Sequence, residues 1–141
     1  MGQFLQASPE AGRAFYQQFH DKGTLVMLNL LKFRTKANYS NEPALDPSEE
    51  ITGAQAYQRY LKGTLPILKK VGGRVIYFGK SHDFLIGPID EKWDALLLVE
   101  YPSMTKFMEL AQSEAYQKVA GHRTAALEDS RLLPSNEMKY E

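Results

Sequence analysis

The chain has 141 residues, of which 17 are basic and 17 acidic, so that its formal net charge is zero. This length fits one domain, the charge balance argues against binding to nucleic acid or an anionic membrane, and no apolar run approaches the roughly 20 residues of a membrane helix. The chain has no cysteine, which excludes disulfides, thiolate nucleophiles, iron–sulfur clusters and cysteine-ligated zinc.

The N-terminal part predicts a helix followed by a strand. Ser8, Pro9 and Glu10 supply a hydroxyl cap, a proline in the first turn and an acid near the positive end of the helix dipole. Gly23 ends that helix. Residues 25–33 are almost all apolar, a pattern typical of a strand that is covered on both faces.

A long polar loop and a second helix come next. Residues 35–50 contain two prolines and predict a loop. Loops of this length are either functional lids or mobile surface segments, and both interpretations stay open. Thr52 begins a helix, because Gln55 stands at the spacing of a capping box. Gly72-Gly73 ends it.

The remaining residues alternate short strands with short helices. In chain order they predict a strand at 74–79, a turn region with His82, a strand at 93–101, helices starting at Ser103 and Ser113, a strand at 129–133 and a polar tail at 134–141.

This order of elements predicts a ferredoxin-like α+β domain, βαββαβ, with an extra N-terminal helix. The two helices of such a domain cover one face of a four-stranded sheet. The strands at 25–33 and 93–101 are apolar on both faces, so that something has to cover the second face. A second copy of the chain is the simplest candidate, and we therefore expect a homodimer.

Four motifs carry a resemblance to a known family. They are Gly72-Gly73 with Arg74, the turn Glu100-Tyr101-Pro102-Ser103, the helix start at 113–117 and the segment 123–132. In this order and spacing they resemble the domain-of-unknown-function family 1330 (DUF1330), over about residues 24–133. The first helix and the 35–50 loop exceed the shorter members of that family.

The resemblance implies a fold and an assembly. The family belongs to the dimeric α/β-barrel superfamily, in which two sheets pack face to face and each subunit has a pocket. Relatives in the superfamily include cofactor-free monooxygenases, small-lactone isomerases and heme-dependent enzymes. The family has no established catalytic residues to carry over. We expect one domain over residues 1–141, with a helical extension at 1–23 before the family core.

Glu100 and His82 are the candidate catalytic residues. A carboxylate on an apolar strand would have a raised pKa suited to a general base unless it is paired. The structural alternative for Glu100 is an ion pair with Arg74, Arg131 or Arg123, of which we expect Arg123. His82 follows a strand and precedes an aspartate, so that it could act as an acid or base or be an ordinary surface histidine.

The candidate ligand-binding residues are aromatic and polar side chains, namely Asn29, Lys32, Tyr57, Tyr60, Trp93 and Arg123. The aromatic residues and the amide are predicted to line a pocket between the sheet and the helix that starts at Thr52, partly roofed by residues 35–50. The cations, together with Arg34, could bind a carboxylate or phosphate. The structural alternatives are an aromatic core, an amide bonded to the backbone of a bulge or loop, and cations that are solvated or in salt bridges.

Two functional classes follow. In the first, the protein is a homodimer that binds a small, partly apolar molecule in a pocket of each subunit. In the second, it is a cofactor-free enzyme of monooxygenase or isomerase type that acts on a small organic substrate. No histidine spacing predicts a metal site, and we expect no cofactor and no nucleic-acid or membrane partner. The first five residues lack the features of a secretory signal, so we expect a cytoplasmic protein.

Overall fold

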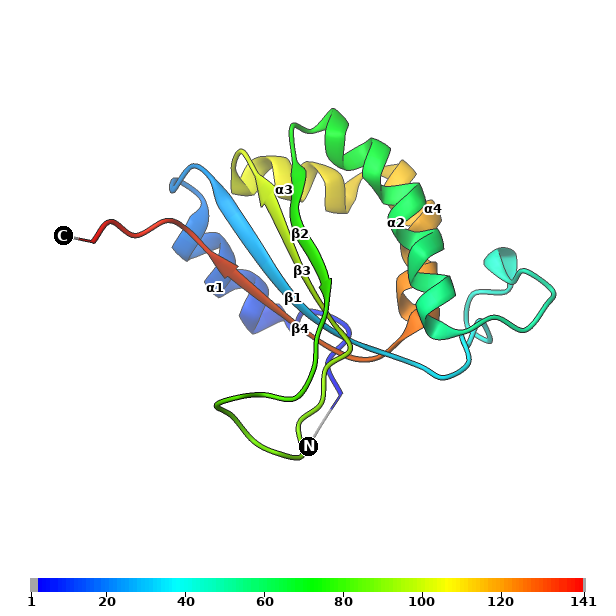
Figure 1. The fold of residues 1–141 in the computed structure, drawn as a ribbon. Helices are drawn as coiled ribbons and strands as arrows, with labels where there is room; N and C mark the ends of the chain where they lie inside the picture. The colour runs from blue at the N-terminus through cyan, green and yellow to red at the C-terminus, as the bar shows by residue number, and fades with distance from the viewer. Residues whose placement is uncertain (1–2, 141) are drawn as a thin grey trace.

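The structure is a computed structural model and describes residues 3–140. Its elements are α1 (Pro9–Phe19), β1 (Leu25–Phe33), the 3-10 turn η1 (Pro43–Leu45), α2 (Gly53–Lys70), β2 (Arg74–Lys80), β3 (Ala95–Tyr101), α3 (Met104–Gln112), α4 (Glu114–Ala126) and β4 (Leu127–Ser135). The four strands form one antiparallel sheet in the order β2-β3-β1-β4. This is the predicted ferredoxin-like α+β arrangement (Figure 1).

Side-chain caps fix the start of each long helix where the sequence predicts it. The hydroxyl of Ser8 accepts the N–H of Ala11 at 3.1 Å. Thr52 and Gln55 form a complete capping box, in which each side chain accepts the other's backbone N–H. The hydroxyls of Ser103 and Ser113 cap α3 and α4, where they accept the N–H of Lys106 and of Tyr116. These contacts are local, which is why the sequence predicts them well.

Four strand boundaries differ from the prediction: β2 ends one residue later, at Lys80, β4 ends two residues later, at Ser135, and the starts of β3 and β4 are shifted. β3 starts at Ala95 instead of Trp93, because the chain bends at Asp94 and the Asp94 carboxylate accepts the N–H of Phe33 at 2.8 Å. β4 starts at Leu127, two residues early. Leu127 is both the C-cap of α4 and an extended residue, with φ −103 and ψ 133, so that the helix passes into the strand without a loop.

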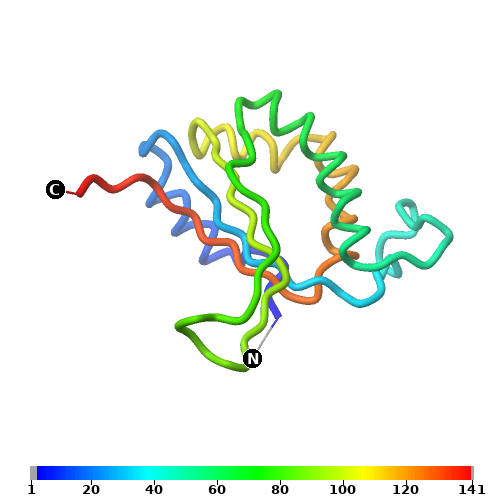
Figure 2. Tube along the Cα trace, viewed as in Figure 1, coloured from blue at the N-terminus to red at the C-terminus, as the bar shows by residue number. Residues whose placement is uncertain are grey.

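The helices gather on one face of the sheet. α2 and α4 lie side by side over it, and α3 continues α4 toward the far end of the strands (Figures 1 and 2). α1 joins this side through Phe15, whose ring contacts Phe107 of α3 at 5.5 Å between centroids.

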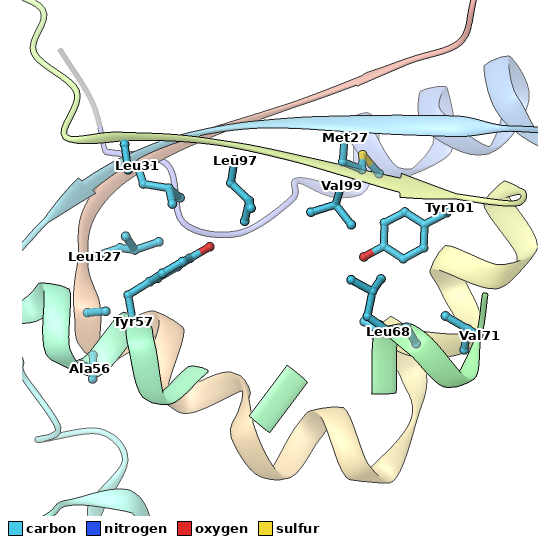
Figure 3. Close-up of a cluster of buried hydrophobic side chains, with 14 of the residues drawn as sticks. Met27, Leu31, Ala56, Tyr57, Leu68, Val71, Leu97, Val99, Tyr101 and Leu127 are labelled. Carbon is cyan, nitrogen blue, oxygen red and sulfur yellow. The ribbon is translucent and has the colours of Figure 1, made fainter. Parts of the chain in front are cut away.

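The core fills the space between the sheet and these helices. Alternate residues of β1 and β3 point into it, and α2 supplies the opposing side chains (Figure 3). The labelled members of this core are Met27, Leu31, Ala56, Tyr57, Leu68, Val71, Leu97, Val99, Tyr101 and Leu127.

The opposite face of the sheet is apolar at its centre and carries charged side chains at both ends of the strands and on β4, and no helix in residues 3–140 packs on it. The strand registers place on it Val26, Leu28, Leu30, Tyr77, Leu96, Leu98 and Leu133. Tyr77 and Leu133 are more than half exposed. We call this set the bare face.

The 35–50 loop packs on α4. The N–H of Asn38 donates to the carbonyl of Ala125 at 2.9 Å. Tyr39 is buried, and its hydroxyl lies 2.8 Å from Nδ1 of His122. The loop is therefore held against the outside of the helix layer. None of the helices in the described part of the chain is both long and apolar enough to cross a membrane.

Candidate functional site

A pocket of about 580 Å³ opens at the end of the sheet where β1 ends and α2 begins. Its lining comes from four segments that meet there, namely Phe33–Thr35, the start of α2, the end of β2 and the start of β3. The lining residues are Phe33, Arg34, Thr35, Thr52, Ala54, Phe78, Gly79, Lys80, Ser81, Asp94 and Ala95. The volume suits a small organic molecule, since ligand pockets span about 300–1,000 Å³.

The floor of the pocket is aromatic and apolar. Phe33 and Phe78 both contact the ring of the buried Tyr57, at centroid distances of 5.5 and 6.4 Å. Tyr57 therefore lies one layer behind the pocket and holds the two phenylalanines in place. Burial raises the pKa of Tyr57, so that its phenol stays neutral.

Two cations, Arg34 and Lys80, line the same pocket. The main chain of Arg34 is fixed, because its N–H donates to Ala126 at 2.8 Å and its carbonyl accepts from Gly53 at 2.9 Å. Its Nε is buried and has no hydrogen-bond partner within residues 3–140. Neither cation has an ion-pair partner among the described residues. Arg34 and Lys80 therefore bring two cations without ion-pair partners in that part of the chain to the pocket, while the Nε of Arg34 itself is shielded from solvent.

Other polar groups complete the lining. Ala54 is the second residue of α2, where the backbone N–H has no acceptor inside the helix. Gly53 allows the start of α2 to approach the main chain of Arg34, since a Cβ on residue 53 would lie 2.3 Å from the carbonyl oxygen of Arg34. Asp94 is the acid of the lining, and one of its oxygens is already bonded to the N–H of Phe33.

A second, smaller hollow of about 320 Å³ adjoins the first. It shares Ser81 and Asp94 with the pocket and also contains His82 and Trp93. His82 therefore lies beside the pocket and outside it. The neighbouring Asp83 bonds to Lys92 at 2.8 Å, and this hydrogen bond lowers the pKa of Asp83.

The predicted amide and tyrosines lie in the core. The side-chain amide of Asn29 donates to the carbonyl of Leu97 at 3.2 Å, so that it bonds to the backbone of strand β3 and not to that of a bulge or loop. Tyr60 bonds to Tyr116, with 2.8 Å between the hydroxyls. Asn29, Tyr57 and Tyr60 do not line the pocket, and residues 35–50 contribute only Thr35 to it.

The remaining predicted ligand-binding residues have partners elsewhere. Lys32 pairs with Glu128 at 3.0 Å, and that hydrogen bond raises the pKa of Lys32. The ring of Trp93 lies 4.9 Å below the guanidinium of Arg131. Arg123 donates to the Leu5 carbonyl at 3.0 Å and to Ser130 at 3.2 Å, so that it ties the N-terminal segment to β4.

The prediction that Glu100 pairs with Arg123 is wrong. Glu100 bonds to Arg74 instead, with 2.9 Å between Oε1 and Nε. The register explains the difference, since Arg74 lies directly opposite Glu100 on β2. Glu100 lies on the bare face of the sheet, whereas the pocket lies on the helix side. The contacts of the described residues do not bring His82 to Glu100.

Sequence reasoning missed Phe33, Phe78 and Lys80 as lining residues. Their positions at the ends of predicted strands were visible, but their spacing is the same as that of core residues. The missing information is where α2 starts relative to those strand ends. Only the close packing of Gly53 on the backbone of Arg34 decides that.

The comparison with protein families assigns the chain. The family described as "Domain of unknown function (DUF1330)" matches residues 48–134. The chain belongs to the DUF1330 family. The search of curated proteins found no match to this DUF1330 chain.

Solved structures similar to this DUF1330 protein support the fold. RPA0582, a protein of unknown function from Rhodopseudomonas palustris, is 34% identical with a TM-score of 0.85, and the match covers 99% of this chain and 100% of that chain. A dimeric protein of unknown function with a ferredoxin-like fold from Bacteroides fragilis is 13% identical with a TM-score of 0.52, covering 82% and 97%. A suspected antibiotic biosynthesis monooxygenase from Caulobacter crescentus is 9% identical with a TM-score of 0.54, covering 89% and 99%. At these low identities, the last two show the fold alone.

Proposed function

We propose that this DUF1330 protein is a homodimer that binds, in each subunit, a small, partly apolar molecule with a carboxylate or similar anionic group. The observation that carries the proposal is that Arg34 and Lys80, which have no ion-pair partner among the described residues, line a pocket with an aromatic floor. A bound anion would give these cations a partner through charge-assisted hydrogen bonds. A planar guanidinium also suits a carboxylate better than a neutral oxygen.

The other lining groups favour the same ligand class. Lys80 adds a second positive charge to the rim. The first turn of α2 presents the N–H of Ala54 and the positive end of the helix dipole to the same space. Phe33 and Phe78 offer surface to the apolar part of the molecule. A neutral, fully apolar ligand would leave the guanidinium and the helix end without partners.

The bare face of the sheet supports the homodimer. Leu28, Leu30, Leu96 and Leu98 form its centre, and Tyr77 and Leu133 are more than half exposed beside them. A second sheet packed on this face would take these side chains out of water. The pocket opens on the helix side of the sheet, so that pairing through the bare face leaves it accessible.

Cofactor-free catalysis is a second candidate function. The observation that favours it is the adjoining hollow, where His82 and Asp94 lie next to the space in which a substrate would bind. A histidine beside a bound molecule can act as an acid or base. If the wild type turns over a bound compound, and His82→Gln abolishes this turnover while binding is unchanged, the enzyme would be favoured over the binding protein.

Binding is tested by fluorescence titration of the single tryptophan, Trp93, which lies in the adjoining hollow. Octanoate and octanamide form a matched pair of probes that differ in charge. We expect saturable binding of octanoate, much weaker binding of octanamide, and a loss of octanoate affinity of about 10- to 100-fold in Arg34→Gln, since hydrogen bonds to charged groups contribute about 1.5–3 kcal/mol.

Arg13→Gln is the matched control, because Arg13 is an exposed residue of α1 away from the pocket. It should bind octanoate as the wild type does. Equal octanoate affinity in the wild type and in Arg34→Gln would contradict the proposed recognition of the anion. Absence of saturable binding by any small apolar carboxylate or amide would contradict the binding function itself.

A further inference from the structure

The connection between β2 and β3 carries an unusually exposed apolar tip. Residues 81–94, which we call the arm, extend from the end of the sheet as a separate projection (Figures 1 and 2). Leu85 is 98% exposed, Ile86 91% and Ile89 87%. Three neighbouring aliphatic side chains in water are unfavourable, and such groups usually mark an interaction site.

Contacts at the base hold the arm away from its own subunit. The N–H of Ser81 donates to the Asp94 carbonyl at 2.9 Å, which closes the two ends of the arm. Asp83 and Lys92 pair across it at 2.8 Å. At the tip, Gly87 lies against Phe84, where a Cβ would come within 2.8 Å of the ring. The tip therefore has a compact turn of its own and no contact with the core of its subunit.

We propose that the arm packs on the second copy of this chain and forms part of the dimer interface. This inference rests on the homodimer of the proposed function. The first argument is continuity, because the strands that carry the arm also supply Tyr77, Leu96 and Leu98 to the bare face. The same two strands thus carry both the apolar side chains of the bare face and, beyond a mostly polar base at residues 80–83 and 90–94, the apolar tip at 84–89.

The second argument is chemical complementarity. Residues 84–89 contain no charged side chain, and the centre of the bare face is also apolar. The nearest cation, Lys92, is neutralised by Asp83, so the arm lacks the free basic residues that draw apolar loops to anionic lipid. In a two-fold dimer each subunit receives the other's arm, so that both tips are covered by the same contact.

The first test compares two sets of substitutions by light scattering over a dilution series. The arm variant is Leu85→Ser with Ile86→Ser and Ile89→Ser. The control is Met138→Ser with Tyr140→Ser, which removes two equally exposed apolar side chains from the C-terminal tail. We expect the arm variant to dissociate at least 10-fold more readily than the wild type and the control to match the wild type. Unchanged circular dichroism and pocket binding of octanoate would show that the subunit is still folded.

The second test places a fluorescent probe on the tip of the arm and does not depend on destabilising the dimer. Because the chain has no cysteine, Leu85→Cys provides a single site for a polarity-sensitive bimane label. We expect blue-shifted emission in the dimer that moves to the red on dilution to monomers. Two results together would overturn the role of the arm and leave the homodimer intact. They are label emission typical of full exposure to water in the dimer, and an arm variant that is still a dimer.

Two further outcomes separate the possible failures. A wild-type chain that is monomeric at every concentration would overturn both the homodimer and the arm contact. The second outcome is that the wild type sediments with neutral phosphatidylcholine vesicles, the arm variant does not, and both remain dimers. This would assign the arm to a lipid surface and overturn the proposal. Octanoate binding is measured separately in each case, so that the pocket is judged independently of the arm.

Discussion

Arg74 and Glu100 form an ion pair across β2 and β3, with Nε 2.9 Å from Oε1. They lie directly opposite each other in the register, at the end of the sheet far from the pocket. Their side chains are 66% and 30% exposed. The pair therefore joins the edge strand to its neighbour while staying in contact with water, which weakens its contribution to stability.

We expect Glu100→Gln to lower the free energy of unfolding by no more than about 1 kcal/mol, as exposed ion pairs typically contribute. Urea unfolding at fixed protein concentration measures it, and Arg74→Gln should behave alike. A loss of about 3–5 kcal/mol, as for a broken buried pair, would mean that the pair is desolvated in the assembled protein.

Gly53→Ala should be strongly destabilising, by about 1–3 kcal/mol or more, because overpacked sites force the backbone to move. The new Cβ would lie 2.3 Å from the Arg34 carbonyl oxygen and 2.5 Å from that of Ala126. Gly12→Ala in α1 is the control, since nothing lies within 4 Å of that position. It should be neutral or stabilising, because alanine favours a helix. Equal stabilities of the two variants would refute the tight contact of α2 on residue 34.

Stability should fall above about pH 10, the ordinary pKa of a phenol. Burial raises the pKa of Tyr57, Tyr60 and Tyr101. The unfolded chain then loses these protons first, so their contribution is complete below pH 10 and is lost as the pH rises toward the folded values. Each phenol adds a slope of up to about 1.4 kcal/mol per pH unit.

Urea unfolding between pH 9 and 11 measures this slope. Tyr60→Phe should reduce it, whereas Tyr140→Phe, which removes a phenol that is 94% exposed, should not. The same slope in Tyr60→Phe as in the wild type would argue against a buried, neutral Tyr60.

The contact between the 35–50 loop and α4 should weaken at acid pH. Burial lowers the pKa of His122, the charge of Arg59 lowers it further, and the charge of Glu42 partly opposes the shift. A lowered folded value means that the stabilisation is complete above about pH 6.5 and is lost as the pH falls through the folded pKa. The protection of the Asn38 amide, which donates to α4, measured as its hydrogen-exchange rate relative to that of an unfolded amide at the same pH, should therefore decrease below about pH 6.5.

His122→Gln cannot titrate and should remove that pH dependence of the Asn38 amide. The exposed His20 and His82 stay in this variant and serve as an internal control for general acid effects. An unchanged acid response would assign it to other groups.

The sequence predicts local features of this fold well and tertiary ones poorly. The capping residues Ser8, Thr52, Ser103 and Ser113 identify the helix starts, since a cap depends on residues three positions away. The partner of Glu100 was predicted wrongly, because of the three candidate arginines the sequence favoured Arg123 and the structure has Arg74. The choice depends on the register of β2 against β3, which also contains an irregularity between Val75 and Tyr77.

The pocket shows the same limit. Tyr57 is predicted from the sequence to line the pocket and Phe78 is not, yet Tyr57 is 1% exposed and Phe78 40%. The difference arises because α2 begins at Gly53 and leaves the strand ends uncovered. Arg34 was noted as a cation at the end of the first strand, but the sequence could not show that its Nε would be buried without a partner.

The most direct test of the central claim is a nuclear magnetic resonance titration of the ¹⁵N-labelled protein with octanoate. The account predicts saturable shifts that are largest for the backbone amides of Arg34, Ala54 and Lys80, all of which line the pocket, and smaller shifts with octanamide. Shifts that are absent at these amides, or equal for the two compounds, would contradict the account.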